Sequence, residues 1–346
     1  MHMEDEALKA VFNSLGFVSG SPAMVPVLRR AYNAASVSDL TVLLEGETGT
    51  GKRVLAQAIH ALDQKRKQYP FITVSCGCVP EALAESEFFG HERGAFSGAV
   101  SDRRGLFQNA HRGTLFLDDV NDLTLNLQVK LLDFLQRRAL RPVGSDREIE
   151  LDVRIIAAAN QPLRPLVLEG RFRADLHYRL DVVRLVLSPL RERSQDLPCL
   201  ILALARRYKH VYAPIDRVEP DLVRFLESQA FPGNVRELEN VVQRMLFLKS
   251  QGTALELEDW LSQAEEQPRG TQEDPLDKAA QGLLQVIREG GIPLAHAIRR
   301  VEEKVLEAAL QSRNRTAREA AALLGTSERT LYRKLRSYYR RHHPSL

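Results

Sequence analysis

A glycine-rich turn between an apolar run and an amphipathic stretch constrains this chain more than any other feature. The segment GETGTGK places Gly46, Gly51 and Lys52 after the β-rich run Leu40–Leu44. The apolar residues that follow have helical spacing, and they are Val54, Leu55, Ala58, Ile59 and Leu62. Glycines in such a strand–turn–helix context let backbone N–H groups turn inward around phosphate oxygens, where the helix N-terminus adds partial positive charge. The pattern predicts a phosphate-binding loop whose lysine reaches the β- and γ-phosphates; from this motif alone, a simple glycine turn remains the alternative.

Two carboxylates follow a second apolar run. The segment GTLFLDDV ends its β-rich part in Asp118 and Asp119, an arrangement in which one carboxylate holds Mg²⁺ and the next orients an attacking water. A third run, VRIIAAAN, ends in Asn160, which is suited to sensing a γ-phosphate or positioning water. Alone, Asn160 would be read as a strand-end cap. Together these motifs predict a site that hydrolyses a nucleoside triphosphate.

Apolar β-rich runs alternate with helical patterns through the first half of the chain, which predicts a parallel, doubly wound α/β sheet. The runs are Leu40–Leu44, 71–74, 114–117, 153–157 and 182–187. After residue 190 the pattern becomes all-helical, and we expect helices near 196–211, 220–229, 234–249 and 256–264. The stretch 265–285 begins with a polar segment that contains Pro and Gly, and we interpret it as a linker.

Positive charge is concentrated at the end of the chain. The net charge is +3, but nine Lys or Arg and two acids fall between Gln311 and Leu346, so the tail carries +7 and the rest −4. This asymmetry indicates a polyanionic partner. No apolar stretch is long enough to cross a bilayer and the first residues are acidic, so we expect a cytoplasmic protein without membrane contact. Three cysteines are too few for a disulfide framework, and we expect all three thiols to be buried.

The basic tail reads as helix, turn, helix. In NRTAREAAALLGTSERTLYRKLRSY, Thr316 and Glu319 fit a capping box, Gly325 fits the turn, and Ser327 fits the cap of a second helix. Arginines can read guanine edges in the major groove and hold phosphates, so we expect this helix to bind double-stranded DNA. A basic, solvated helix is the alternative. The predicted DNA-binding residues are Thr316, Ser327, Arg329, Thr330, Arg333, Lys334 and Arg336.

An ordered set of segments carries a family resemblance. The chain contains GETGTGK, ESEFFGHERGAFSGA, GTLFLDD, QVKLLDFLQ, DVRIIAAAN, GRFRADLHYRL, PLRER and FPGNVRELEN. In this order they resemble the AAA+ ATPases that activate sigma-54 RNA polymerase, the bacterial enhancer-binding proteins, from about Phe17 to Leu261. The tail resembles the Fis-type DNA-binding domain. The resemblance implies an extension over 1–16, an AAA+ α/β subdomain over 17–190, a helical lid over 191–264, and a Fis-type helix-turn-helix domain over 286–346, after the linker.

The resemblance also implies residue roles. ATP would bind at Gly46, Glu47, Thr48, Gly49, Thr50, Gly51, Lys52, Arg53 and the lid arginine Arg236, with Asp118 on Mg²⁺ and Asp119 and Asn160 at the attacking water. Arg173 and Arg179 resemble the pair that supplies an arginine finger to the neighbouring subunit, which implies an oligomer, typically a hexameric ring. The resemblance of the tail to Fis-type domains implies that it binds DNA as a dimer. The loop Gly94, Ala95, Phe96, Ser97, Gly98 and Ala99 resembles the sigma-54 contact, with Phe96 as the contacting side chain.

Four positions near the predicted nucleotide site depart from the family pattern. Asp119 stands where Glu is usual, Ser75 where Asn is usual, and Arg53 and Gln108 where Glu is usual. Because Asp is one methylene shorter than Glu, its carboxylate can sit about 1 Å from the ideal position, which costs roughly 10²-fold in rate if nothing compensates. We expect an active ATPase that is slow.

The expected function is therefore sigma-54-dependent activation of transcription, in which ATP hydrolysis remodels the closed polymerase complex. The alternative is a DNA-binding regulator whose impaired ATPase only controls oligomerisation. A AAA+ unfoldase is disfavoured, because no aromatic pore-loop motif stands in the usual place. About sixteen residues precede the AAA+ segment, where relatives often carry a sensing domain, so we expect control by expression level or by a separate regulatory protein.

Overall fold

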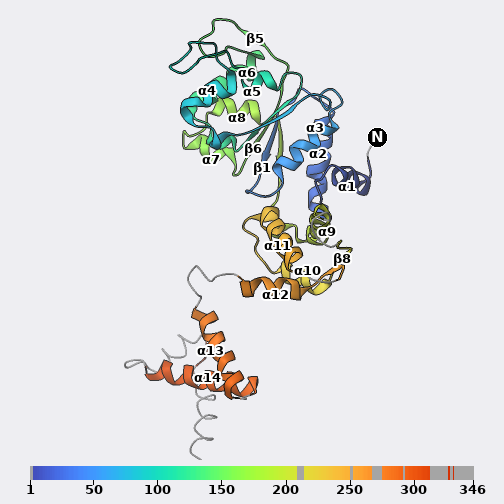
Figure 1. The fold of residues 1–346 in the computed structure, drawn as a ribbon, viewed down its shortest axis with the longest axis vertical. Coiled ribbons are helices and arrows are strands. Elements are labelled where there is room, and N and C mark those ends of the chain that lie inside the picture. The colour runs from blue at the N-terminus through green and yellow to red at the C-terminus, as the bar shows by residue number, and fades with distance from the viewer. Residues whose placement is uncertain are drawn as a thin grey trace, which may run out of the picture. The chain divides into compact units, whose positions relative to one another are not determined.

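The computed structural model describes residues 3–208, 214–249, 252–266, 275–290, 293–311, 326–327 and 330. The chain divides into two compact units, Met1–Glu266 and Gln267–Leu346. The first unit holds the sheet domain and a helical lid, and the second holds the described helices of the C-terminal part (Figure 1).

A five-stranded parallel sheet in the order β2-β3-β6-β1-β7 forms the centre of the first unit. Its strands are β1 (Val42–Glu45), β2 (Phe71–Ser75), β3 (Thr114–Asp118), β6 (Arg154–Ala159) and β7 (Val183–Val186). The register pairs Ser75 with Asp118 and Glu45 with Ala159, so these strands end at one edge of the sheet. Every predicted β-rich run forms a strand, and the predicted α/β class is confirmed.

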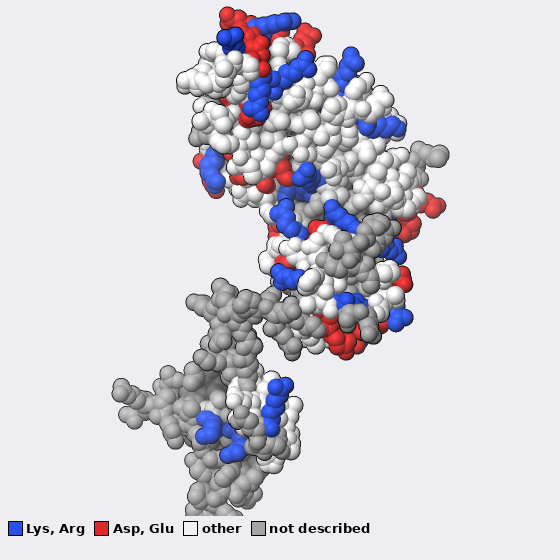
Figure 2. All heavy atoms as spheres, viewed as in Figure 1, with Lys and Arg blue, Asp and Glu red and all other residues white. Residues whose placement is uncertain are grey.

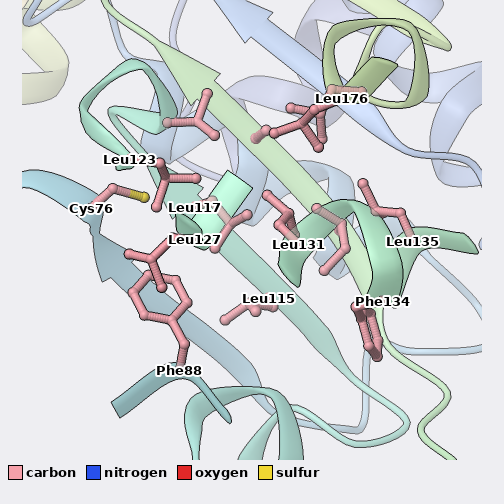
Figure 3. Close-up of a cluster of buried hydrophobic side chains, with 14 of the residues drawn as sticks. Cys76, Phe88, Leu115, Leu117, Leu123, Leu127, Leu131, Phe134, Leu135 and Leu176 are labelled. Atoms are coloured by element: carbon pink, nitrogen blue, oxygen red, sulfur yellow. The ribbon is translucent and has the colours of Figure 1, made fainter. Parts of the chain in front are cut away.

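Helices cover both faces of this sheet. One face packs Leu44, Phe116 and Ile156 against α1 (Asp5–Ser14), α2 (Val25–Ala35) and α3 (Lys52–Leu62). The other packs Leu43 and Leu115 against five helices, which are α4 (Glu81–Phe89), α5 (Leu106–Asn109), α6 (Leu125–Arg137), α7 (Leu163–Leu168) and α8 (Ala174–Leu180). Figure 3 shows part of this second cluster, including Phe88, Leu131 and Phe134. Alternate residues of each central strand are therefore buried on opposite faces, which is why these strands read as continuous apolar runs.

The lid is a small helical domain with its own apolar core. Its helices are α9 (Leu197–Arg207), α10 (Pro220–Glu227), α11 (Asn234–Leu248) and α12 (Leu257–Glu266), and a two-stranded pair joins β8 (Arg217–Val218) to β9 (Ala254–Leu255). Leu204, Leu226, Leu238 and Met245 pack in its core. The helical lid that the sequence predicts is confirmed.

Short elements complete the described structure. A hairpin pairs β4 (Ala139–Leu140) with β5 (Ile149–Glu150). The 3-10 turns are η1 (Pro22–Met24), η2 (Cys76–Cys78), η3 (Val120–Asp122), η4 (Leu190–Glu192) and η5 (Ser194–Asp196). The expectation of three buried thiols is wrong, because only Cys76 is buried while Cys78 is exposed and Cys199 is partly exposed. In the 3-10 turn η2, successive side chains point in different directions, so Cys76 faces the core and Cys78 faces solvent.

In the second unit, α13 (Pro275–Gly290) contacts α14 (Leu294–Gln311). Helix α13 begins inside the segment 265–285, which the sequence predicts to be a linker; the described part of that segment from Pro275 onward is helical, and its role as a linker between domains stays a prediction. Composition suggested a linker, but the apolar spacing of Leu276, Ala279, Leu283 and Ile287 is helical, and Pro275 suits a first helical position.

Charges of both signs lie on the face of the first unit that Figure 2 shows. Within the described ranges, no helix has the length and apolar character needed to span a membrane.

Candidate nucleotide site and GAFSGA loop

The phosphate loop, residues 46–51, joins the end of β1 to the start of α3. Gly46, Gly49 and Gly51 all have positive φ, at 154°, 82° and 103°. A Cβ at Gly46 would lie 2.6 Å from the carbonyl oxygen of Leu187, and one at Gly49 would overlap the carbonyl oxygen of Gly233. Backbone conformation and close packing therefore both require glycine here.

Lys52 is buried at the start of α3, with its ammonium group turned back over the loop. Its Nζ donates to the carbonyl oxygens of Gly46 at 2.6 Å and Glu47 at 3.0 Å. Burial lowers the pKa of Lys52, while the charges of Asp118 and Asp119 raise it. The structure thus brings together the lysine and the carboxylates that the sequence predicts.

Glu47 ties the phosphate loop to the lid. Arg191 donates to both carboxylate oxygens, at 2.8 and 2.6 Å, and the side-chain amide of Asn234 donates at 3.1 Å. These bonds, that of Arg191 first, lower the pKa of Glu47 to about 2. The side chain of this predicted nucleotide-binding residue therefore holds a structural contact.

Asp118 and Asp119 lie where β3 ends. Burial, and then the neighbouring charge of Asp119, raises the pKa of Asp118, whereas Lys52 and Arg53 lower it. The backbone of Asp119 is in the left-handed region, with a φ of 52°, and Asp119 is the N-cap residue of the turn η3. Asp tolerates this region better than most residues. Two carboxylates beside a buried lysine form a site suited to a divalent cation held partly by phosphates.

Of the four departures from the family pattern, Ser75 and Arg53 lie near Asp118. Ser75 is the register partner of Asp118. Arg53 donates through Nη2 to Thr73 Oγ1 at 3.5 Å, so the arginine lies over β2. Gln108 accepts from the backbone N–H of Gly105 at 3.0 Å, which holds the start of α5.

Asn160 follows β6, and its backbone N–H donates to Asn121 Oδ1 at 3.4 Å. Because β6 lies between β1 and β3, Asn160 is at the same sheet edge as the phosphate loop and Asp118. Parallel strands place their carboxyl ends together, and this is where open α/β sheets bind ligands.

Three predicted arginines occupy different positions. Arg173, at the N-cap of α8, is exposed and donates through two nitrogens to Asp175, which raises its pKa. Arg179 is exposed on α8. Arg236 lies in the first turn of α11 beside Gly49, and its charge contributes to lowering the pKa of Lys52. All three arginines are exposed, but only Arg236 lies beside the phosphate loop of its own chain.

The loop 94–99 is a compact turn in the segment between α4 and α5. The N–H of Gly94 donates to the carbonyl of Ala99 at 2.8 Å, and the N–H of Ala99 donates to that of Phe96 at 3.0 Å. Gly94 and Gly98 have φ of 84° and 113°, and nothing lies within 4 Å of a Cβ built on either. Ser97 lies in the same turn and is exposed.

Phe96 is 38% exposed, and its ring lies edge-on to His91 with centroids 5.0 Å apart. His91 is itself fixed, because its Nδ1 lies 2.6 Å from Ser86 Oγ. A second loop packs beneath: Ala95 touches Gly144, and Ser145 Oγ donates to Glu92 at 2.5 Å. The turn thus presents a partly exposed ring on a fixed base.

In the C-terminal unit, Ser327 Oγ accepts from the backbone N–H of Thr330 at 3.2 Å, an N-cap contact. The other predicted DNA-binding residues lie outside the described residues, and they are Thr316, Arg329, Arg333, Lys334 and Arg336. Their role stays a prediction.

Sequence reasoning missed the contacts that Arg191, Arg193 and Asn234 make with the phosphate loop. In the sequence analysis, PLRER carries only the family resemblance, and FPGNVREL adds a predicted role for Arg236 alone. No local pattern in them signals a contact across more than 140 residues of chain.

Three family models match consecutive parts of the chain. They are the sigma-54 interaction domain over residues 17–186, the AAA+ ATPase lid domain over 191–276, and the bacterial regulatory protein, Fis family, over 297–338. The chain is 38% identical to the regulatory protein AtoC of Escherichia coli (strain K12) over 322 residues, which span 93% of this chain and 67% of AtoC. It is 47% identical to the transcriptional regulatory protein GlrR of the same organism over 234 residues, or 67% of this chain and 52% of GlrR.

Among solved structures, NtrX from Brucella abortus in complex with ADP is similar, with a TM-score of 0.63 and 27% identity over 93% of this chain and 69% of NtrX. A structure of NtrX in complex with ATP matches equally well. The chain spans from about half to two thirds of the length of AtoC and GlrR. The order of the matched domains and the match to AtoC show that this chain belongs to the sigma-54-dependent transcriptional regulators, with an ATPase-type AAA+ domain, a lid and a Fis-type helix-turn-helix domain.

Proposed function

We propose that this chain hydrolyses ATP in an oligomeric ring bound to upstream DNA, and that hydrolysis drives the 94–99 loop to remodel the closed complex of sigma-54 RNA polymerase. The observation that carries the proposal is the presence in one domain of a tightly packed phosphate loop and a separate glycine-flanked turn exposing Phe96. The first suits a ligand held in one geometry, and the second suits a contact that moves.

At the nucleotide site, the N–H groups of residues 46–51 and the ammonium of Lys52 would hold the phosphates, and Arg236 would close the site from the lid. Asp118 would hold Mg²⁺, which neutralises charge on the phosphate oxygens when bound. No cluster of three or more His, Cys, Asp or Glu in the described part of the chain could bind a metal by itself. A cation held jointly by Asp118 and phosphates fits that finding.

Asp119 and Asn160 would orient the attacking water at the same sheet edge. Arg173 and Arg179 are exposed on and beside α8, where they are available to a neighbouring subunit's nucleotide. Such an arginine stabilises charge on the departing phosphoryl group and is worth roughly 10³ to 10⁵ in rate. The shorter Asp119 makes hydrolysis slow.

The decisive experiment measures promoter melting. Purified protein, sigma-54 polymerase and ATP are incubated on a sigma-54 promoter, and open complexes are detected by permanganate footprinting. Wild type is compared with Phe96→Ala and with Val100→Ala, a control just after the loop whose side chain is 83% exposed. We expect melting that requires ATP hydrolysis in wild type and Val100→Ala and is lost in Phe96→Ala, with equal ATPase rates in all three.

A second function is favoured by the departures at Asp119, Ser75 and Arg53: a DNA-binding regulator in which nucleotide only controls oligomerisation. DNA binding without melting in wild type would contradict the first proposal and support this one. Asp119→Glu would then be the next variant, because recovery of melting would assign the defect to the short carboxylate.

A further inference from the structure

The carbonyl oxygens of the phosphate loop are held from outside the loop. Lys52 holds those of Gly46 and Glu47. The next three accept from residues of the lid region: Asn234 Nδ2 to Thr48 at 3.0 Å, the N–H of Val235 to Gly49 at 3.0 Å, and Arg193 Nη2 to Thr50 at 2.7 Å. Two of these three donors are side chains, so they can be changed by substitution.

Arg193 is buried, and both terminal nitrogens of its guanidinium group donate hydrogen bonds. Its Nη1 donates to Asp196 at 3.3 Å, and Asp196 is fully buried. The other oxygen of Asp196 accepts from Ser19 Oγ, Gly20 N and Ser21 N at 2.9, 2.7 and 2.6 Å. Arg193 Nε has no partner among the described residues. Burying an ion pair with an unsatisfied nitrogen is weak evidence for stability, so a role in placing Thr50 explains Arg193 better.

Asn234 is also buried, and its backbone is in the left-handed region that Asn tolerates. Its φ is 55°, and its Oδ1 accepts from the N–H of Leu190 at 2.8 Å while its Nδ2 faces Thr48 and Glu47. The amide therefore cannot rotate without losing bonds on both sides. The hydrogen bond from Leu190 to Oδ1 therefore orients the Nδ2 donor of Asn234 toward the phosphate loop.

We propose that Arg193 and Asn234 are positioning residues for the nucleotide phosphates. The peptide group is planar and trans, so fixing the carbonyl of one residue fixes the N–H of the next in the opposite direction. Holding Thr48 O and Thr50 O outward turns the N–H groups of Gly49 and Gly51 inward, where a phosphate would lie. A movement of the lid is then transmitted to those N–H groups through two side chains. The inference rests on the proposed function only in that the ligand is a nucleotide.

The test compares binding of ADP with binding of adenosine, which lacks the phosphates. Asn234→Asp keeps the acceptor for Leu190 but turns an acceptor toward Thr48, and Arg193→Gln removes the charged donor. Arg191→Gln is the control, because Arg191 lies in the same turn and bonds only the side chain of Glu47 on the loop. ADP affinity is measured by isothermal titration with Mg²⁺, and adenosine affinity by ligand-observed NMR.

We expect ADP affinity to fall about tenfold or more in Asn234→Asp and Arg193→Gln and less than about threefold in the exposed control, while adenosine affinity is unchanged. Arg193→Lys should recover part of the loss, and it serves as the test if Arg193→Gln does not fold. An unchanged ADP affinity in the folded variants, an equal loss for ADP and adenosine, or no ADP binding by wild type would overturn the inference. If the wild-type protein binds ADP as expected but melts no promoter, the proposed function is wrong and the inference about Arg193 and Asn234 still stands.

Discussion

The phosphate loop and the 94–99 loop use the same local device in opposite surroundings. Each contains glycines with positive φ, Gly49 at 82° and Gly94 at 84°. At Gly49 an added Cβ would overlap a lid carbonyl, whereas at Gly94 nothing lies within 4 Å. One loop is enclosed by the lid and the other stands in solvent.

The difference shows that glycine spacing predicts a turn, but it does not predict whether the backbone of that turn can move. Packing decides whether the backbone is held or can move, and packing depends on segments far away in sequence. For a loop that holds phosphates, enclosure maintains one geometry. For a loop that contacts a partner, open space permits displacement.

The strongest test of the comparison is an alanine at each glycine. Gly49→Ala places a Cβ on a backbone in the left-handed region and against the carbonyl oxygen of Gly233. We therefore expect it to lower the free energy of unfolding by about 3 kcal/mol and to abolish ADP binding. Gly94→Ala adds only the conformational cost, about 1 kcal/mol. Urea unfolding of both variants measures the difference; equal losses would mean that enclosure does not separate the loops.

A second test separates the two loops by ligand. Lys52→Ala removes a buried ammonium that holds two loop carbonyls and faces the phosphates, so ATP affinity should fall by roughly 10²-fold. Phe96→Ala should leave ATP affinity unchanged. Equilibrium binding of a fluorescent ATP analogue measures both, and a loss in Phe96→Ala would show that the loops are coupled in the isolated protein.

The smallest expected effect concerns pH and the contact between Glu47 and Arg191. The pKa of Glu47 is about 2 against an ordinary 4.5, so folding favours the ionised carboxylate. Its stabilisation is complete above the ordinary pKa and is lost as pH falls through the interval toward 2. The difference in unfolding free energy between wild type and Glu47→Gln should shrink over that range, and a difference that does not vary with pH would contradict the ion pair. The residues of the 94–99 loop carry no ionisable side chain, so they should not add to the pH dependence of the unfolding free energy in this range.

Much of the sheet domain was predictable, because its signals are local. Each β-rich run became a strand, and the rule that parallel strands end together placed Asp118 and Asn160 beside the phosphate loop. The order of the strands was not predictable, since it depends on which apolar faces pack. The hydrogen bond from Arg193 to the carbonyl oxygen of Thr50 joins residues 143 apart in sequence, and no hydrophobic periodicity predicts such a contact.

One error and one helix that the sequence analysis did not predict have the same origin. The interpretation of 265–285 as linker relied on composition, yet apolar residues at helical spacing form α13 from Pro275. The expectation for Cys78 relied on the usual burial of cysteine, yet a 3-10 turn directs it to solvent. In both cases a general tendency of the residues was outweighed by local backbone geometry.

The edge-on contact between Phe96 and His91 has a kinetic and entropic consequence. A side chain that must be immobilised on association costs about 0.5 to 1.5 kcal/mol. Because the ring of Phe96 packs against His91, which Ser86 holds in place, part of that loss is incurred during folding. The rate at which a partner associates with this ring should then be set by diffusional encounter, because the ring does not first have to search among rotamers.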